Sequence, residues 1–328
     1  MGIKDIRFGI IGAGSIAHTF SKALKGLGGN LYAISSRNIK KASAFKETYG
    51  FKNAYGSYED MVKDPHVDIV YVATPHALHK THMMLALSHG KHVICEKPFT
   101  LNAVQAQHVF SYAKSKNLFV MEAMWTKFLP VIKEVQDIVS NGDIGTIEKV
   151  TSAFCFKIDQ DHKKDRLFNM DMGAGALLDI GIYNVTFSYL FLGMPKKISS
   201  KVLMHQNGMD LEDDVFFEYE NQSASFFISL KDSKPADAMI YGTKGMIKVF
   251  DFFRTEKAEV YDLNGHLVKQ IEHPHKFNGF EYQIEDVVSC LMNQKIESDV
   301  MSYHETLNIL KIMDHLRKNW NLVYPTER

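Results

Sequence analysis

The sequence predicts an α/β fold of two domains, with a doubly wound parallel sheet in the N-terminal domain and a large, mainly antiparallel open sheet in a C-terminal α+β domain. Three observations support this prediction. Up to residue 122, short apolar runs alternate with longer amphipathic ones, as in βαβ units. A glycine-rich turn follows the first apolar run. Beyond residue 123, strand-like runs follow one another with few helical patterns between them, which favours an antiparallel sheet.

The 328 residues suffice for two domains of ordinary size, and we place the domains at 1–122 and 123–328. The strands expected in the first domain are short and apolar, often on both faces, as in a sheet that helices cover on both sides. They are Arg7–Ile11, Asn30–Ser35, Val67–Ala73, His92–Cys95 and Leu118–Glu122. The helical patterns between them are Ser15–Leu27, Ile39–Tyr49, Ser57–Lys63, His76–His89 and Asn102–Lys116.

The second domain begins with an expected helix at Leu129–Ser140 and a strand at Ile147–Lys157, followed by a mostly apolar helix at Leu177–Phe191. Strand-like runs then extend from Ile198 to about Val268, with aromatic residues on both faces. One face could pack on helices and the other on a second subunit, or the aromatics could be half-buried within one chain. Two expected helices close the chain, Glu281–Met292 and Tyr303–Trp320.

Composition excludes several classes of protein. Lys plus Arg and Asp plus Glu both number 38, so the chain lacks the basic surplus typical of nucleic-acid binding. We find no apolar run of the about 18 residues that a membrane span needs. The three cysteines are far apart in the sequence, which is typical of a cytoplasmic protein. His76, His79 and His82 have helical spacing, but no Cys or carboxylate at a recognised spacing accompanies them, and we expect no metal.

The turn after the first strand predicts a dinucleotide site. Gly12 and Gly14 fit a G-x-G-x-x-A pattern that ends at Ala17. The first glycine permits a tight turn, the second lets a pyrophosphate approach the backbone, and the alanine lets the helix pack on the strand. The N–H groups at the helix start, around Ser15 and Ile16, would face the anion. The alternative is a turn with a purely structural role, although its strand–turn–helix context favours binding.

The end of the second strand suggests which dinucleotide is bound. NAD sites usually carry Asp or Glu about 20 residues beyond the glycines, to hold the ribose 2′-hydroxyl. Here the sequence has Ser36 and Arg37 and no carboxylate. A hydroxyl and a guanidinium can both bind a 2′-phosphate. We therefore expect NADP(H) to be preferred, with NAD(H) as a possible second cofactor; Arg37 could instead be an ordinary surface residue.

Two further strand ends and one glycine-rich segment carry polar residues. Thr74-Pro75 and Glu96-Lys97-Pro98 follow apolar strands, where open α/β sheets bind ligands, although a structural Glu96–Lys97 ion pair would also explain the second. In the segment 173–183, Asp179 and Tyr183 have i, i+4 spacing and share a helix face. Burying a carboxylate and a phenol is costly without a purpose; the alternative is a helix N-terminal Asp and a core Tyr.

These motifs resemble the glucose–fructose oxidoreductase/inositol dehydrogenase (Gfo/Idh/MocA) family. The resemblance covers essentially the whole chain, including Tyr241–Gly245 and the closing Tyr324-Pro325. Within the family, Glu122–Phe128 and Tyr183 look most like the dimeric dihydrodiol dehydrogenases and the NADP-linked D-xylose dehydrogenases. Ala174 departs from an expected run of three glycines. The resemblance implies a Rossmann domain for 1–122, and a domain in 123–328 that binds substrate and forms a homodimer through its sheet.

The resemblance also implies roles for individual residues. Lys97 and Tyr183 would be catalytic, with Asp179 as an orienting carboxylate, because a nearby ammonium favours the phenolate that can accept a proton. The cofactor would lie near Gly12, Gly14, Ser15, Ile16, Ser36, Arg37, Thr74, Pro75, His79, Glu96 and Lys97. Trp125, near the domain junction, is a candidate wall of the substrate pocket, and weaker candidates are Phe154, Phe156 and Arg166.

We therefore expect an NADP(H)-dependent oxidoreductase that moves a hydride between nicotinamide and a small polyol, aldose or trans-dihydrodiol. One alternative is an NADPH-dependent sugar or dicarbonyl reductase. Another is a non-catalytic NADP-sensing regulator on the same fold. The presence of both Lys97 and Tyr183 argues against the regulator, because a sensor needs only the residues between Gly12 and Arg37. The expected partners are a small-molecule substrate and a second copy of the chain.

Overall fold

The computed structural model describes residues 2–158 and 166–327 of the chain. The chain forms two compact units. The first unit comprises the residues up to Trp125 together with His275–Leu307. The second unit comprises Thr126–Pro274 and the residues from Asn308 onwards. The first unit is therefore assembled from two separate pieces of the chain. The predicted domain boundary between 122 and 123 stays a prediction.

The first unit is built on a six-stranded sheet of order β3-β2-β1-β4-β5-β6 in which every pairing is parallel. This confirms the predicted doubly wound sheet, whose strand order reverses beside β1. The strands are β1 (Arg7–Ile11), β2 (Asn30–Ser35), β3 (Asn53–Tyr55), β4 (Ile69–Val72), β5 (His92–Glu96) and β6 (Val120–Ala123). Strand β3 was not predicted, because its three half-buried residues show no apolar pattern.

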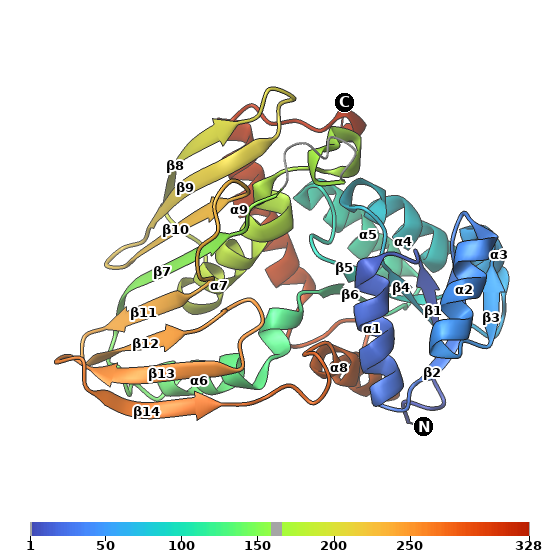
Figure 1. Cartoon of the computed structure of the whole chain (residues 1–328), viewed down its shortest axis with the longest axis horizontal. Helices are drawn as coiled ribbons and strands as arrows, with labels where there is room; N and C mark the ends of the chain where they lie inside the picture. The colour runs from blue at the N-terminus through green and yellow to red at the C-terminus, as the bar shows by residue number, and fades with distance from the viewer. Residues whose placement is uncertain (1, 159–165, 328) are drawn as a thin grey trace. The chain divides into compact units, whose positions relative to one another are not determined.

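The helices of the first unit begin in two different ways. α2 (Ile39–Tyr49), α3 (Tyr58–Lys63) and α5 (Ala103–Ser115) each start at a side-chain cap that accepts a backbone N–H. In α1 (Ser15–Gly26), by contrast, the first residue is preceded by Gly14 and no side chain caps the helix. The unit also contains α4 (His79–Ser88) and α8 (Glu281–Met292) (Figure 1). The boundary between the units falls within α9 (Tyr303–Asn319).

The second unit is built on an eight-stranded sheet of order β14-β13-β12-β11-β7-β10-β9-β8. β7 and β10 run parallel, and the other pairings in the described sheet are antiparallel, which confirms the predicted mainly antiparallel architecture. The strands are β7 (Ile147–Cys155), β8 (Lys197–Met204), β9 (Asp210–Glu218), β10 (Ser223–Ser229), β11 (Ala238–Gly242), β12 (Gly245–Val249), β13 (Lys257–Asp262) and β14 (Leu267–Glu272).

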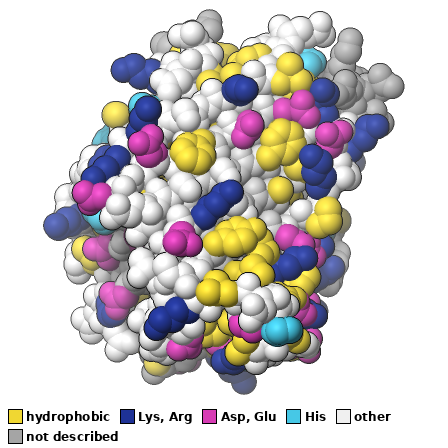
Figure 2. Space-filling view, turned by 90° about the vertical axis from the view of Figure 1, so that its left-hand side faces the viewer, with side chains coloured by type: hydrophobic (Ala, Val, Ile, Leu, Met, Phe, Trp, Pro, Cys, Tyr) yellow, Lys and Arg dark blue, Asp and Glu magenta, His cyan; other side chains and the backbone are white. Residues whose placement is uncertain are grey.

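The two faces of this sheet differ in burial. Val215 and Phe217 on β9 are fully buried, together with Ile228 on β10, on the face that helices α6 (Pro130–Ser140) and α7 (Ile182–Leu192) cover (Figure 1). The opposite face is open and carries apolar side chains among charged ones, as Figure 2 shows. Its half-buried or exposed apolar residues are Leu203, Phe216, Phe227, Met239, Tyr241, Met246 and Tyr261.

The apolar helix predicted at Leu177–Phe191 differs from the observed one at its start. Residues Leu177–Gly181 form a π-helical turn, and the α-helix α7 begins only at Ile182. By length and composition the stretch Met170–Leu192 is apolar enough to cross a membrane, since an 18-residue window within it has a mean hydropathy of 1.3. However, 72% of that window is buried inside the protein, which is the pattern of a core helix.

Candidate active site

Three strand ends of the first unit lie side by side. The final residues of β1 and β4, Ile11 and Val72, are paired, and β5 continues the row. Because the strands are parallel, the residues that follow them emerge along one carboxyl edge of the sheet. Gly12 and Thr74 lie there, and Glu96 is the last residue of β5; all three belong to the predicted cofactor site. Ligands of open α/β sheets bind at this edge.

The glycine turn has the geometry that a pyrophosphate needs. Gly12 has a φ of +100°, and a Cβ there would lie 2.7 Å from the carbonyl oxygen of Ala73, so only glycine fits. At Gly14, by contrast, no atom of the described residues other than its chain neighbours lies within 4 Å of the position a Cβ would take. The first turn of α1, with Ser15 and Ile16, has no side-chain cap and no acidic residue. Its N–H groups can therefore receive an anion.

Arg37 is exposed just beyond β2 and lies near two aromatic side chains of the first unit. Burial raises the pKa of Tyr58, and the Arg37 guanidinium partly opposes that shift. Burial, together with the smaller effect of the Arg37 charge, lowers the pKa of His82 to about 4. The His82 ring contacts the Thr74 hydroxyl at 2.9 Å. Ser36 is buried, and its hydroxyl accepts a hydrogen bond from a backbone N–H at 3.3 Å.

His79 links two of the strand-end loops. Its Nδ1 lies 2.8 Å from the carbonyl oxygen of Pro98, and its Nε2 lies 2.7 Å from that of Thr74. Both partners are acceptors, so both contacts are hydrogen bonds only when the ring carries two protons. The ring is fully buried. Pro75 precedes a 3₁₀ turn that leads into α4, and the peptide bond between Lys97 and Pro98 is cis.

Two buried glutamates support the loop that carries Lys97. Tyr71 donates a short hydrogen bond to Glu96. Glu122 accepts the N–H of Phe99 at 2.9 Å and the hydroxyl of Thr306, also at 2.9 Å. The supporting role of Glu122 was not predicted, because its two partners lie 23 and 184 residues away in the chain. The signal that the sequence offered for this role was a carboxylate at the end of an apolar strand.

Trp125 is buried within the first unit. Its ring lies 4.8 Å from that of Phe280, measured between ring centroids, and 6.4 Å from that of His275. Gly279 leaves room for the indole, because a Cβ there would lie 2.7 Å from it. These contacts explain the burial of Trp125 as packing, and its expected role beside the substrate stays a prediction.

The predicted residues of the second unit form two neighbouring groups. Arg166 Nη2 donates to Asp179 Oδ1 at 3.0 Å, and Asp179 is part of the π-helical turn. The ring of Tyr183 lies 5.8 Å from that of Phe154 and 5.6 Å from that of Phe253. Phe154 and Phe253 stack at 4.3 Å. A phenol set among phenyl rings is shielded from water, which strengthens its electrostatic interactions.

Phe156 is less closely involved, with its ring 6.4 Å from that of Phe154. Phe253 was not among the predicted site residues. This residue follows β12 in a loop where no strand or helix pattern marks it out. It reaches Phe154 only because β7 and β12 both pair with β11 in the sheet.

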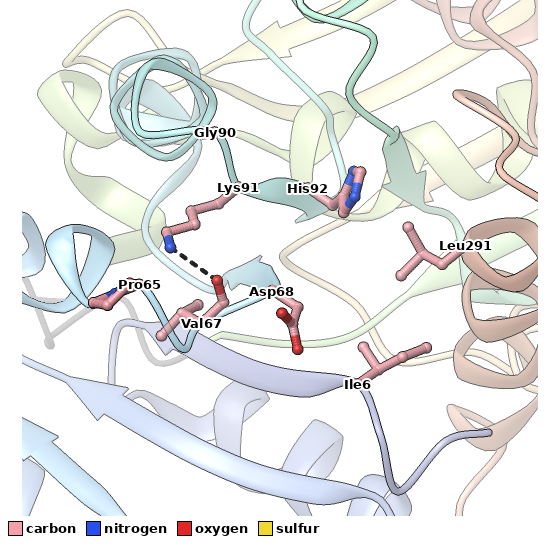
Figure 3. Close-up of a pocket in the computed structure, with 8 residues that line it drawn as sticks. All are labelled: Ile6, Pro65, Val67, Asp68, Gly90, Lys91, His92 and Leu291. Atoms are coloured by element: carbon pink, nitrogen blue, oxygen red, sulfur yellow. Dashed lines mark hydrogen bonds between the residues drawn. The ribbon is translucent and has the colours of Figure 1, made fainter. Parts of the chain in front are cut away.

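A cavity of about 280 Å³ also lies in the first unit (Figure 3), but at the opposite edge of the sheet. Its lining includes the starts of β4 and β5 rather than their ends. The Lys91 ammonium donates to the carbonyl oxygens of Asp64 and Val67, at 2.7 and 2.9 Å, and Arg7 holds Asp68. The lining residues are Ile6, Pro65, Val67, Asp68, Gly90, Lys91, His92 and Leu291. We do not assign this cavity to the cofactor.

Comparison with known proteins places this chain in a family. Residues 6–124 match the family model described as an oxidoreductase family with an NAD-binding Rossmann fold. Residues 132–248 match the GFO/IDH/MocA C-terminal domain. The chain belongs to the Gfo/Idh/MocA oxidoreductase family. This confirms the resemblance inferred from Gly12, Thr74-Pro75 and Glu96-Lys97-Pro98, and identifies the protein as an oxidoreductase.

Two curated family members align along nearly the whole chain. One is the trans-1,2-dihydrobenzene-1,2-diol dehydrogenase of Xenopus tropicalis, 32% identical, with 97% of this chain and 99% of that protein aligned. Another is the scyllo-inositol 2-dehydrogenase (NADP(+)) IolU of Bacillus subtilis, 31% identical, with 98% and 99% aligned. The solved structures include the 3-ketoreductase KijD10 of Actinomadura kijaniata in complex with NADP and TDP-benzene. That protein is 25% identical to this chain, and the two structures superpose with a TM-score of 0.84 over 95% of this chain and 97% of that one.

Proposed function

We propose that this Gfo/Idh/MocA protein is an NADP(H)-dependent oxidoreductase that acts on the CH–OH group of a small polyol, aldose or trans-dihydrodiol. The observation that carries the proposal is the pairing of an uncapped, glycine-led helix α1 with Ser36 and Arg37 at the end of β2. The names of the relatives support it: two are dehydrogenases of a diol and an inositol, one of them NADP(+)-dependent, and the ketoreductase structure contains NADP.

The residues of the first unit fit the cofactor. The turn at Gly12 and Gly14 and the start of α1, at Ser15 and Ile16, would receive the pyrophosphate. Ser36 and Arg37 would bind the 2′-phosphate, since a guanidinium pairs well with phosphate oxygens. The row of Thr74, Pro75, His79, Glu96 and Lys97 would border the nicotinamide end. When bound, the nicotinamide supplies or accepts the hydride.

We propose that Tyr183 moves the accompanying proton. Its hydroxyl would take the proton from the substrate hydroxyl in oxidation and return it to the carbonyl oxygen in reduction. The ammonium of Lys97 would favour the charged phenolate during this transfer. Asp179, held by Arg166 at 3.0 Å, would orient the reacting groups. Phe154 and Phe156 of the second unit, and Trp125 of the first, would each supply apolar surface to a small ring or carbon chain.

Calorimetric titration with NADPH and, separately, NADH tests the cofactor proposal. We expect NADPH to bind at least about tenfold more tightly, because a charge-assisted contact to the 2′-phosphate contributes about 1.5–3 kcal/mol. Tighter NADH binding would refute the role of Arg37 but leave the dehydrogenase proposal in place. Failure to bind either nucleotide would refute both. The preferred nucleotide then serves in assays of both directions, with scyllo-inositol, xylose and a trans-dihydrodiol as substrates.

We also propose that the protein is a cytoplasmic homodimer that pairs through the open face of the eight-stranded sheet. The apolar residues of that face support the dimer, since a face of this kind commonly marks an interaction site. Phe216 and Leu203, for example, are 42% and 43% exposed. The three cysteines, all buried free thiols, support a reducing compartment.

Light scattering coupled to size-exclusion chromatography tests the dimer. The wild-type protein should have twice the mass of one chain, and the double substitution Phe216→Glu, Phe227→Glu should give a monomer. Leu263→Glu is the control, since this residue is 69% exposed on the β13–β14 hairpin. A wild-type protein that runs as a monomer at micromolar concentration would refute the proposal.

A further inference from the structure

Two carboxylic acids lie buried together in strand β9 of the second unit. Asp210 and Asp213 are both completely inaccessible to solvent, and their side chains are close enough for a hydrogen bond between them. Within the described part of the chain, nothing donates a proton to Asp210 Oδ1 or to either oxygen of Asp213. We call these two residues the β9 carboxyl pair. Two carboxylates at this distance without a donor repel each other.

The pair is attached to the backbone that leads to the candidate active site. Asp210 Oδ2 accepts the N–H of Leu177, the first residue of the π-helical turn, at 2.5 Å. Asp210 Oδ1 occupies the space next to Gly175, where a Cβ would overlap it, and Gly175 has a φ of +119°. The neighbouring carbonyl oxygen of Ala174 accepts the hydroxyl of Tyr324 at 2.7 Å. The turn 174–177 is thus held at three of its four residues.

The surrounding charges do not neutralise the pair. The charge of Arg317 partly opposes the raised pKa of Asp210, but Nη1 and Nη2 of its guanidinium already pair with Glu327, at 2.8 and 3.0 Å, and with Asp314 at 3.1 Å. Tyr324 and Glu212 also face the pair, and the carboxylate of Glu212 adds to the negative charge. Burial raises the pKa of both aspartates, and the charge of Asp210 raises that of Asp213 further. The lower-energy arrangement has one proton between the two groups.

We propose that Asp210 and Asp213 share one proton and act as positioning residues, locking the turn 174–177 that leads into the segment bearing Asp179 and Tyr183. The shared proton supplies the donor that Asp213 otherwise lacks, and it leaves Asp210 Oδ2 free to accept the N–H of Leu177. The locked turn fixes where the π-helical turn begins, five residues before α7. The positioning of Tyr183 for catalysis rests on the function proposed above, whereas the lock itself does not.

The substitution Asp213→Asn tests the shared proton, because its amide can donate to Asp210 without titrating. In the wild type, the raised pKa means that the folded state binds a proton that the unfolded state releases above about pH 4. The stability due to this proton is complete at low pH and is lost as the pH rises through the folded-state value. Denaturant unfolding should therefore show the unfolding equilibrium constant rising with pH by up to about tenfold per unit relative to Asp213→Asn. Parallel pH profiles of the two proteins would overturn the proposal.

Amide hydrogen exchange at Leu177 tests the lock without any assay of activity. In Asp213→Asn, the amide of Leu177 should keep its wild-type protection from exchange. In Asp213→Ala, this amide should exchange at least about tenfold faster, because its acceptor Asp210 loses the side chain with which it shares the proton. Asp143→Asn is the control, an exposed aspartate of the same unit. If Asp213→Ala does not fold, the pH profiles of the wild type and Asp213→Asn still decide whether the two aspartates share a proton. Equal protection in folded Asp213→Ala would overturn the lock.

Steady-state kinetics then tests the positioning. Asp213→Ala should lower kcat with little change in KM or in NADPH affinity, and Asp213→Asn should restore kcat. A wild-type protein without activity that still shows the pH profile and the exchange difference would refute the proposed function but not the lock. An active enzyme in which folded Asp213→Ala keeps full kcat would overturn the positioning role.

Discussion

The guanidinium of Arg166 donates to the carboxylate of Asp179 at 3.0 Å, across 13 residues of chain. The side chain of Asp179 is only 12% exposed, whereas that of Arg166 is 40% exposed. The more accessible partner therefore holds a carboxylate that is nearly buried within the π-helical turn. The pair combines a residue predicted to contact substrate with one predicted to orient the reacting groups.

Replacing Arg166 by Gln should separate these two roles. We expect a loss of stability below about 1 kcal/mol, because partly exposed ion pairs contribute little. We expect a fall of about tenfold in kcat/KM, because one charge-assisted hydrogen bond contributes about 1.5–3 kcal/mol. Lys196→Gln, which breaks an exposed pair with Glu220 in the same unit, serves as the control. Unchanged kinetics in Arg166→Gln would show that the contact between Arg166 and Asp179 is not needed for the reaction.

Tyr183→Phe should remove the proton transfer and little else. The phenyl ring keeps the packing against Phe154 and Phe253. We expect kcat to fall by about 10²–10⁴, the usual contribution of a general acid–base group, while the NADPH affinity measured by calorimetry stays unchanged. Tyr189→Phe, on the same helix, should retain activity. A Tyr183→Phe enzyme with near wild-type kcat would remove this residue from the mechanism.

Arg37→Asp should change both the cofactor affinity and a neighbouring titration. NADPH affinity should fall about 10- to 100-fold, through loss of a charge-assisted contact. The pKa of His82, lowered to about 4 chiefly by burial and further by the Arg37 charge, should rise when the positive charge is removed. NMR of the imidazole measures this shift directly in the cofactor-free protein. Lys114→Asp, elsewhere on the surface of the first unit, is the charge-matched control and should change neither quantity.

Glu122→Ala should destabilise the first unit. The substitution leaves the N–H of Phe99 and the hydroxyl of Thr306 without their acceptor, and each buried group left unsatisfied costs about 1–3 kcal/mol. Thr306→Val alone should cost less, because it removes only one of the two contacts. Denaturant unfolding of the single and double mutants gives the coupling between Glu122 and Thr306. Additive effects would mean that the hydrogen bond at 2.9 Å does not contribute to stability.

Local pattern predicted most of the architecture, because it reports burial. The bounds of β1, β2 and α2 agree with prediction to the residue. Pattern could not predict the π-helical turn, because an apolar run has no period that distinguishes π from α. Nor could it predict the partner of Asp179, since ion pairs depend on tertiary geometry rather than spacing.

The burial of the β9 carboxyl pair could not be predicted from local sequence either. Asp210 and Asp213 are ordinary polar residues in the sequence, and their spacing in a strand would place them on opposite faces. Both are buried in the structure. Their common environment comes from the turn 174–177 and from Arg317, which lie 33 and more residues away in the chain. No short segment of the sequence contains both the two aspartates and the residues that surround them in the structure.

The two-piece construction of the first unit has a consequence for how the protein is synthesised. Trp125 packs against Phe280, Glu122 bonds to Thr306, and the N–H of Val120 donates to the carbonyl oxygen of Ile296 at 3.1 Å. During translation, Phe280, Ile296 and Thr306 leave the ribosome only after all the strands of the second unit have been translated. The nascent Rossmann segment must therefore wait with the edge strand β6 incompletely bonded, and a chain stopped at residue 125 should be prone to aggregate.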